Sequence, residues 1–198
     1  MTSKEGEIAS LRDSLDELET WLRRLGRARL VERLQTGLSE ETVRRSLEGV
    51  GLVASEDLCV LYGWRDGTRI AVGEVLDDFH IFPGFFFSPL EEALENYGKF
   101  RVDRRWNSEW LPVLANGGGD FYAVDSTSEM ASPVIGFMID QDEQPVEYSS
   151  LSTMLRSWVD AFASDAFYVD SRGYLVADDD RYVEIAARNN PDVPLWNT

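Results

Sequence analysis

Cysteine and histidine are almost absent from this sequence of 198 residues. Cys59 is the one cysteine, so no disulfide can form within the chain, and zinc sites built from several Cys and His ligands are excluded. The one histidine, His80, would have to serve any Cys-His or Ser-His-Asp machinery. Cys59 lies in the apolar run "DLCVLYGW", which favours a buried structural thiol over a catalytic one.

Long apolar runs are also missing. The first residues carry charges every few positions, and nowhere do about 18 apolar residues follow one another. We therefore expect a cytoplasmic protein without a membrane span. Hydrophobic residues make up 43% of the chain and aromatics 12%, which predicts a folded core and excludes a disordered chain.

Basic residues are scarce in the second half of the chain. The net charge is -17, and residues 107–180 hold 14 acids against only Arg156 and Arg172. Such a surface repels nucleic acid and anionic membranes, and it speeds association with a basic partner. Excess acid also confers solubility, so the charge alone leaves the choice open.

Regular spacing of apolar residues predicts the helices. Leucines and one isoleucine from Ile8 to Leu25 recur three or four residues apart, and Gly26 can end that helix. This seam is short for a coiled coil, so it favours packing against the chain's own body over dimerisation. Five more helices are expected: 40–47, "EDLCVLYGW" after Ser55, "SPLEEALENYG" with Ser88 as N-cap and Gly98 as its end, 151–162 after Ser149 or Ser150, and one in "DDDRYVEIAARNNP", capped by an Asp and ended by Asn190 and Pro191.

Short β-rich runs predict the strands. "RDGT" is typical of an Asp-Gly turn and would lead into a strand at "RIAVGEVL". "WLPVLA", "FYAVD" and "SPVIGFMID" predict an antiparallel meander, and "FYVDSRGYLVADD" predicts a hairpin that turns at Gly173. Helices before and after a central sheet indicate an α+β fold.

Three consecutive glycines in "WLPVLANGGGDFYAVD" raise the question of a phosphate-binding loop. Such a loop needs a helix after it, and a cation nearby helps. Here a β-rich run follows, and no Lys or Arg occurs from Asn107 until Arg156. The glycines therefore predict a connection between strands. The acidic run 140–143 does not fit a calcium loop, because Pro145 and Leu151 stand where that loop needs Gly and Glu.

Phe85, Phe86 and Phe87 follow one another in an aromatic segment. Aromatic side chains are mostly core, but three adjacent residues of one strand cannot all point to the same face. We therefore expect one of them to be exposed as a contact.

Several segments, in their order along the chain, resemble the SUKH superfamily. The segments are "DLCVLYGWRDG", "SPLEEAL", "WLPVLANGGGDFYAVD", "PVIGFM" with "YSSLSTMLRSWVDAF", and "RNNPDVPLW". This superfamily includes fungal cell-wall assembly regulators and many bacterial toxin-immunity proteins. The resemblance runs from about Leu47 to the C-terminus, with Ala54 where the family usually has proline. It divides the single globular unit into a helical extension, 1–38, and a SUKH-like domain, 39–198.

The resemblance implies a curved, mostly antiparallel sheet wrapped by helices. It also implies non-catalytic binding, without catalytic residues. We further expect no cofactor, no metal, and no nucleic acid or membrane as partner, and a monomer or dimer. A bacterial immunity protein of this kind binds a cognate toxin domain, here one expected to be basic and to act on nucleic acid. The alternative is an intracellular regulatory or scaffold protein of the fungal type. An enzyme with paired carboxylates is a third class, but 36 acids always offer pairs, so no pair is informative.

Acidic residues between Asp120 and Asp170, together with aromatic anchors, are the expected contacts with a basic partner. The candidate partner-binding residues are Trp64, Asp66, Phe85, Phe86, Asp120, Asp140, Asp142, Glu143 and Glu147.

Overall fold

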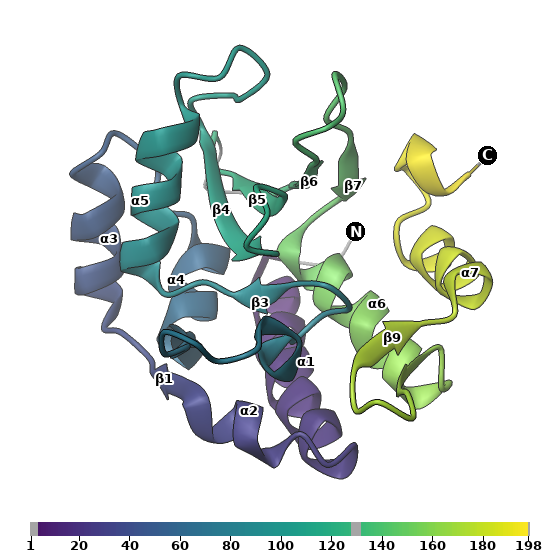
Figure 1. The fold of residues 1–198 in the computed structure, drawn as a ribbon. Coiled ribbons are helices and arrows are strands. Elements are labelled where there is room, and N and C mark those ends of the chain that lie inside the picture. The colour runs from purple at the N-terminus through teal and green to yellow at the C-terminus, as the bar shows by residue number, and fades with distance from the viewer. Residues whose placement is uncertain (1–3, 128–131, 198) are drawn as a thin grey trace.

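The computed structural model describes residues 4–127 and 132–197, so Glu129 of the acid-rich stretch lies outside the described residues. The α-helices are α1 (Lys4–Arg24), α2 (Ala28–Arg33), α3 (Glu40–Glu48), α4 (Glu56–Trp64), α5 (Leu90–Phe100), α6 (Leu151–Ala163) and α7 (Asp179–Asn189), and two short 3-10 helices are η1 (Leu76–Phe79) and η2 (Pro194–Trp196). The strands are β1 (Leu34–Thr36), β2 (Arg65–Thr68), β3 (Phe86–Phe87), β4 (Trp110–Ala115), β5 (Phe121–Asp125), β6 (Val134–Phe137), β7 (Val146–Tyr148), β8 (Phe167–Val169) and β9 (Leu175–Ala177). Figure 1 shows their arrangement.

The central sheet has five antiparallel strands in the order β3-β4-β5-β6-β7. Two-stranded pairs, β1-β2 and β8-β9, lie outside it. The α+β class and the meander β4-β5-β6 are confirmed, and so is the hairpin β8-β9 with Gly173 at a φ of +89°. Strand β7 was not predicted, because "VEY" is too short to show an alternating pattern.

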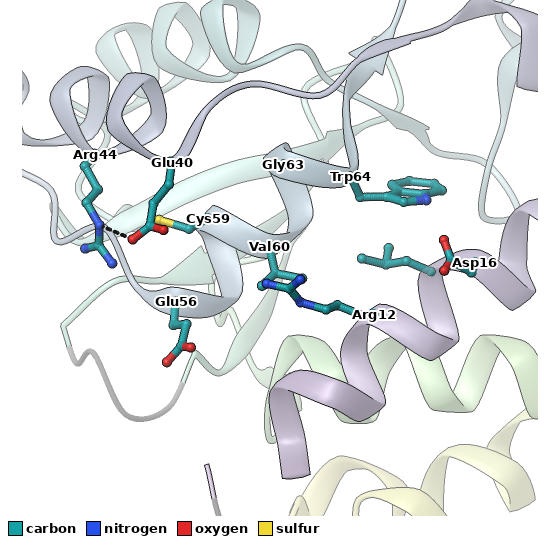
Figure 2. Close-up of a pocket in the computed structure, with 10 residues that line it drawn as sticks. Arg12, Asp16, Glu40, Arg44, Glu56, Cys59, Val60, Gly63 and Trp64 are labelled. Carbon is teal, nitrogen blue, oxygen red and sulfur yellow. Dashed lines mark hydrogen bonds and ion pairs between the residues drawn. The ribbon is translucent and has the colours of Figure 1, made fainter. Parts of the chain in front are cut away.

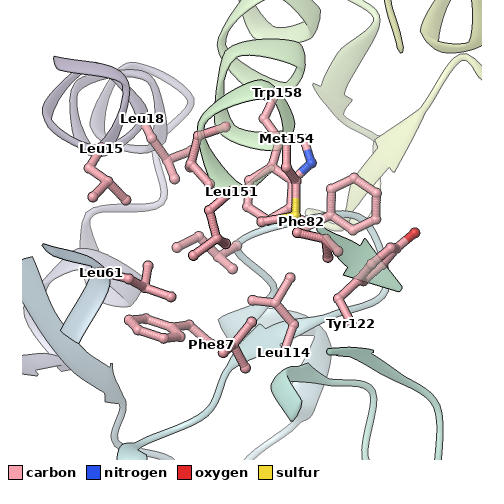
Figure 3. Packing of buried hydrophobic residues seen from close by; sticks show 14 of the residues in the cluster. Leu15, Leu18, Leu61, Phe82, Phe87, Leu114, Tyr122, Leu151, Met154 and Trp158 are labelled. Atoms are coloured by element: carbon pink, nitrogen blue, oxygen red, sulfur yellow. The ribbon is translucent and has the colours of Figure 1, made fainter. Parts of the chain in front are cut away.

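Helix α1 packs on α6 and α4, and its leucine stripe enters the main core (Figure 3). Leu11, Leu15, Leu18 and Leu22 are at most 1% exposed. The expectation that this stripe packs against the chain's own body is confirmed. Because the stripe is buried here, it offers no seam to a second copy.

Both faces of the central sheet are covered, which overturns the expectation for the three adjacent phenylalanines. Phe85 and Phe87 join the main core under α1 and α6, while Phe86 points to the opposite face. There a second cluster covers it, formed by Phe86, Trp106, Ala115, Phe121, Ala123 and Phe137. All three phenylalanines are buried, so none of them is an exposed contact. The side chains of adjacent residues do point to opposite faces of the sheet, as expected, but a hydrophobic cluster covers each of the two faces.

The segment 65–76 differs from its prediction. Residues predicted to form a turn, Arg65–Thr68, are strand β2 and pair with β1. The predicted strand "RIAVGEVL" is absent from the described structure, where residues 69–75 are an irregular loop with a turn at 72–73 and Leu76 begins η1. Glu74 holds this loop by accepting a hydrogen bond from the Ala71 N–H at 2.8 Å. Valines favour strands only where a neighbouring strand is available to pair with them.

The capped helix ends are mostly as predicted. Ser39, Ser55 and Ser150 each accept a hydrogen bond from the third residue beyond them, at the starts of α3, α4 and α6. Asp178 does the same for α7. These side chains satisfy N–H groups that have no partner within the first turn.

Helix α5 has a different cap from the predicted one. The helix begins at Leu90, with Pro89 rather than Ser88 at the N-cap position, and it runs past Gly98. Asp66 of β2 supplies the cap, since its Oδ1 accepts a hydrogen bond from the Leu90 N–H at 2.8 Å. The capping residue therefore comes from 24 residues earlier in the chain.

Replacing Asp66 by alanine is expected to lower the free energy of unfolding by about 1 kcal/mol, because the Leu90 N–H loses its acceptor. Urea denaturation measures this change. Asp66→Asn keeps an acceptor oxygen and is expected to lose less stability. Equal losses in the two variants would contradict the capping role.

Candidate functional site

Two turns at one end of the sheet bring together most of the predicted acidic residues. They are the β4-β5 turn, residues 116–120, and the β6-β7 turn, residues 138–144, and we call them the paired turns. Asp120 joins them, because its Oδ1 accepts a hydrogen bond from the Ile139 N–H at 2.8 Å. Carboxylates from two connections therefore share one surface.

The β4-β5 turn holds the three consecutive glycines. Gly117 and Gly119 have φ values of +80° and +106°, which glycine adopts without strain. The Asn116 side-chain oxygen accepts from the N–H groups of Gly118 and Asp120, at 2.7 and 3.1 Å. Strand β5 follows the turn. These N–H groups are thus used within the turn, and the glycines connect strands as predicted.

The β6-β7 turn exposes its carboxylates. Asp140, Asp142 and Glu143 are all exposed, and the turn is held from inside by Gln144, which accepts from the Met138 N–H at 2.7 Å. Within the described residues, Asp140 and Glu143 form no ion pair. Their charge is therefore available to a partner.

Two arginines that precede the acid-rich stretch in sequence reach this surface. Arg104 pairs with Asp142 at 3.2 Å, with both side chains more than 80% exposed. Arg105 donates to the carbonyl oxygens of Ile139 and Gln141, at 2.6 and 3.0 Å. An exposed pair such as Arg104–Asp142 contributes little stability, so a partner can displace it at small cost.

Arg105 also pairs with Asp103 at 2.8 Å. This hydrogen bond and a second one from the Arg105 backbone lower the pKa of Asp103 to about 2. The paired turns and this adjoining segment together carry five carboxylates against two guanidinium groups: Asp103, Asp120, Asp140, Asp142 and Glu143 against Arg104 and Arg105. The surface stays negative, although less so than the sequence count predicted.

The other predicted residues are not on this surface. Phe85 and Phe86 are buried in two different clusters, and Asp66 caps α5. Glu147 is buried in β7, where its carboxylate accepts a hydrogen bond from Tyr122 Oη at 2.9 Å. Phe85, Phe86 and Glu147 are buried, so a partner cannot reach them, and they are corrected as contact candidates. Asp66 is half-buried, and its carboxylate serves as the cap of α5.

Trp64, the remaining candidate, lies in a groove of about 630 Å³ between α1, α3 and α4 (Figure 2). Its ring stacks on Phe87, with centroids 6.4 Å apart. Charged and apolar side chains line the groove: Arg12, Leu15, Asp16, Glu40, Arg44, Glu56, Cys59, Val60 and Trp64, with Gly63 between the last two.

The groove mixes charges of both signs. Arg44 donates to Glu40 at 2.8 Å and to the Ala54 carbonyl oxygen at 3.0 Å. Burial raises the pKa of the Cys59 thiol, so it is a weak nucleophile at neutral pH. The one histidine faces Asp77, with Nδ1 3.6 Å from its carboxylate, and is not among the groove residues. The groove thus holds no nucleophile activated by a histidine base.

The sequence offered one signal for this groove that the prediction did not use. Residues 58–62 of α4 are apolar in an unbroken row, so the helix has no polar outer face. All five residues are buried, and Cys59 and Val60 of this row border the groove. The residues of α1 and α3 that form its walls come from elsewhere in the chain, and no local pattern links them.

No described helix is long and apolar enough to cross a membrane. The described residues contain no group of three or more His, Cys, Asp or Glu side chains placed to hold a metal ion. No protein-family model and no curated protein matches this sequence.

Proposed function

We propose that this chain is a non-catalytic protein-binding module, an immunity protein that neutralises a basic toxin domain acting on nucleic acid. The observation that carries the proposal is the acidic surface of the paired turns, where Asp140 and Glu143 are exposed and without an ion pair among the described residues. A toxin that acts on nucleic acid needs a cationic surface for phosphates, and fixed carboxylates can occupy that surface.

The paired turns are organised before a partner arrives. Asn116, Asp120, Gln144 and Arg105 fix both turns through hydrogen bonds to backbone groups. A preorganised surface loses little conformational entropy on binding, so more of the interaction energy appears as affinity. The sequence resemblance to toxin-immunity proteins supports the same function.

The groove around Trp64 favours the second candidate, a regulatory or scaffold protein. Its walls carry both Arg12 and Asp16, so it does not select a basic partner by charge. A partner bound there would show weak dependence on salt, whereas binding to the paired turns would weaken steeply as salt rises.

Co-expression with the toxin encoded beside its gene tests the proposed function. We expect cells to survive the toxin only when this protein is present, and the two purified proteins to form a complex. Equal killing with and without this protein, or no complex, would rule out the immunity function for that pair.

Neutralising the β6-β7 turn is expected to weaken the complex. In the variant Asp140→Asn, Asp142→Asn, Glu143→Gln, we expect affinity to fall by about tenfold or more at low salt, because three attractive charges are lost. Calorimetry at two salt concentrations measures the affinity and its salt dependence.

The matched control removes the same charge from the exposed side of α1, with Glu5→Gln, Asp13→Asn and Glu17→Gln. Both variants lose three negative charges, so only a local contact separates them. Equal weakening in the two variants would show long-range attraction without a contact at the paired turns.

A further inference from the structure

The edge of the central sheet at β7 is covered by the end of the chain. Strand β7 pairs only with β6 in the five-stranded order, so its other side presents backbone groups to be satisfied. The Ser149 N–H donates to the Asn190 side-chain oxygen at 3.1 Å, and the Glu147 carbonyl oxygen accepts from Trp196 Nε1. These alternate groups are the ones that an added strand would use.

Residues 190–197, which we call the C-terminal strap, are held to the rest of the chain through Asn190, Val193 and Trp196. Asn190 is fully buried and also donates to Ser157 Oγ at 3.3 Å. Val193 is buried, and the Trp196 ring packs on Tyr148 with centroids 5.9 Å apart. Leu195 is 39% exposed and the rest of the strap is mostly exposed. Local opening of such a segment needs little of the total unfolding free energy.

Glu147, whose carbonyl oxygen accepts the hydrogen bond from Trp196, also has a buried carboxyl group. Glu147 is 9% exposed, and Gly136 of β6 makes room for it: a Cβ on Gly136 would lie 2.0 Å from Glu147 Oε1. The carboxyl group reaches Tyr122 of β5 across the space that the glycine leaves.

The groups that face this carboxyl group are tyrosine hydroxyls. Tyr122 donates to it, and Tyr148 and Tyr182, from β7 and α7, share a hydrogen bond of 2.5 Å nearby. No cationic side chain of the described residues acts on Glu147. Burial raises its pKa to about 7, and the Tyr122 hydrogen bond opposes this only in part.

We propose that the C-terminal strap is a releasable cover on the β7 edge, closed while the Glu147 carboxyl group is neutral and opened when it ionises. An ionised carboxylate here has no counter-charge, and the nearest relief is to turn β7 outward into water. That movement takes the Glu147 carbonyl oxygen away from Trp196. The strap then loses the hydrogen bond that its Trp196 end makes with β7, and the β7 edge is uncovered. This inference does not depend on the toxin-binding proposal.

Hydrogen-exchange mass spectrometry at pH 5.5 and 8.5, corrected for the intrinsic rates, tests the proposal. We expect the wild-type protection factors of residues 145–149 and 190–197 to fall by about tenfold or more at pH 8.5, while those of α6 are retained. Glu147→Gln cannot ionise and is expected to keep strap protection at both pH values. Glu143→Gln, four residues away and exposed, is the control that should behave as wild type.

Three results would overturn the proposal. They are an unchanged strap in the wild-type protein at pH 8.5, the same loss in Glu147→Gln, and a loss spread evenly over the whole chain. If Glu147→Gln does not fold, Tyr122→Phe replaces it. Removing the Tyr122 donor raises the pKa of Glu147 further, so the pH midpoint of strap opening must move to higher pH. A midpoint at the wild-type pH would contradict the proposal.

Discussion

Replacing Arg27 by methionine is expected to lower the free energy of unfolding by about 3–5 kcal/mol. Arg27 is buried between α1 and α2, and its guanidinium group donates to three carbonyl oxygens. The acceptors are Asp77 at 2.9 Å, His80 at 3.1 Å and Gly173 at 3.3 Å. One side chain thereby ties the α1-α2 junction to η1 and to the β8-β9 hairpin.

The loss is large because methionine fills the space but donates nothing. Three carbonyl groups then lose the donors they have in the folded state, and the loss is costliest at His80, whose hydrogen bond to Arg27 is buried. Burial lowers the pKa of Arg27, while the nearby Asp78 and Asp77 oppose that change. Their attraction to the guanidinium group is lost as well.

Urea denaturation of Arg27→Met and Arg27→Lys measures this effect. Lysine keeps the charge but presents a single ammonium group, so we expect an intermediate loss. Arg156→Met, on the exposed side of α6, is the control and is expected to change the free energy of unfolding by less than about 0.5 kcal/mol. If Arg27→Met lowers the free energy of unfolding no more than this control does, the buried hydrogen bonds of Arg27 do not stabilise the fold.

Strong local signals account for what the sequence predicted correctly. The stripe from Ile8 to Leu25 and the capped helix α6 each depend on residues within one segment, and both form as expected. The prediction of a strand at residues 69–76 was wrong because a strand depends on a partner from elsewhere in the chain. Val72 and Val75 favour a strand, but none of the described strands pairs with them, and both side chains are exposed.

The candidate surface was predicted in part. Asp140, Asp142 and Glu143 are in a turn that ends one strand and begins another, so their exposure follows from local sequence. The arrival of Arg104 and Arg105 does not, because it depends on how the α5-β4 connection folds back over that turn. The burial of Glu147 also needed the fold, since Gly136 makes its space from a different strand.

Raising the pH through neutrality is expected to lower the free energy of unfolding of the wild-type protein more than that of Glu147→Gln. The ordinary pKa of this carboxyl group is 4.5, and burial raises it to about 7 in the folded state. Between these values the folded protein holds a proton that the unfolded chain has lost. The free energy of unfolding therefore falls as pH rises, by at most about 3 kcal/mol in all, and the fall ends above the folded-state pKa.

The measurement is the difference between wild type and Glu147→Gln in urea denaturation from pH 4 to 9. Other groups titrate in this range, but they are common to both proteins and cancel in the difference. Below pH 4.5 the difference should be constant, whatever the amide itself costs. A difference that stays constant up to pH 9 would show that Glu147 ionises normally in the folded protein.

The size of the fall also limits what the C-terminal strap can do. With the strap closed, the ionised carboxylate is buried and the full loss of about 3 kcal/mol accumulates. With the strap open, the carboxylate reaches water, so the loss stops at the free energy that opening costs. If the free energy of unfolding stops falling after a small loss, opening the strap therefore costs little free energy. The pH at which it levels off should match the pH at which residues 190–197 lose protection from exchange.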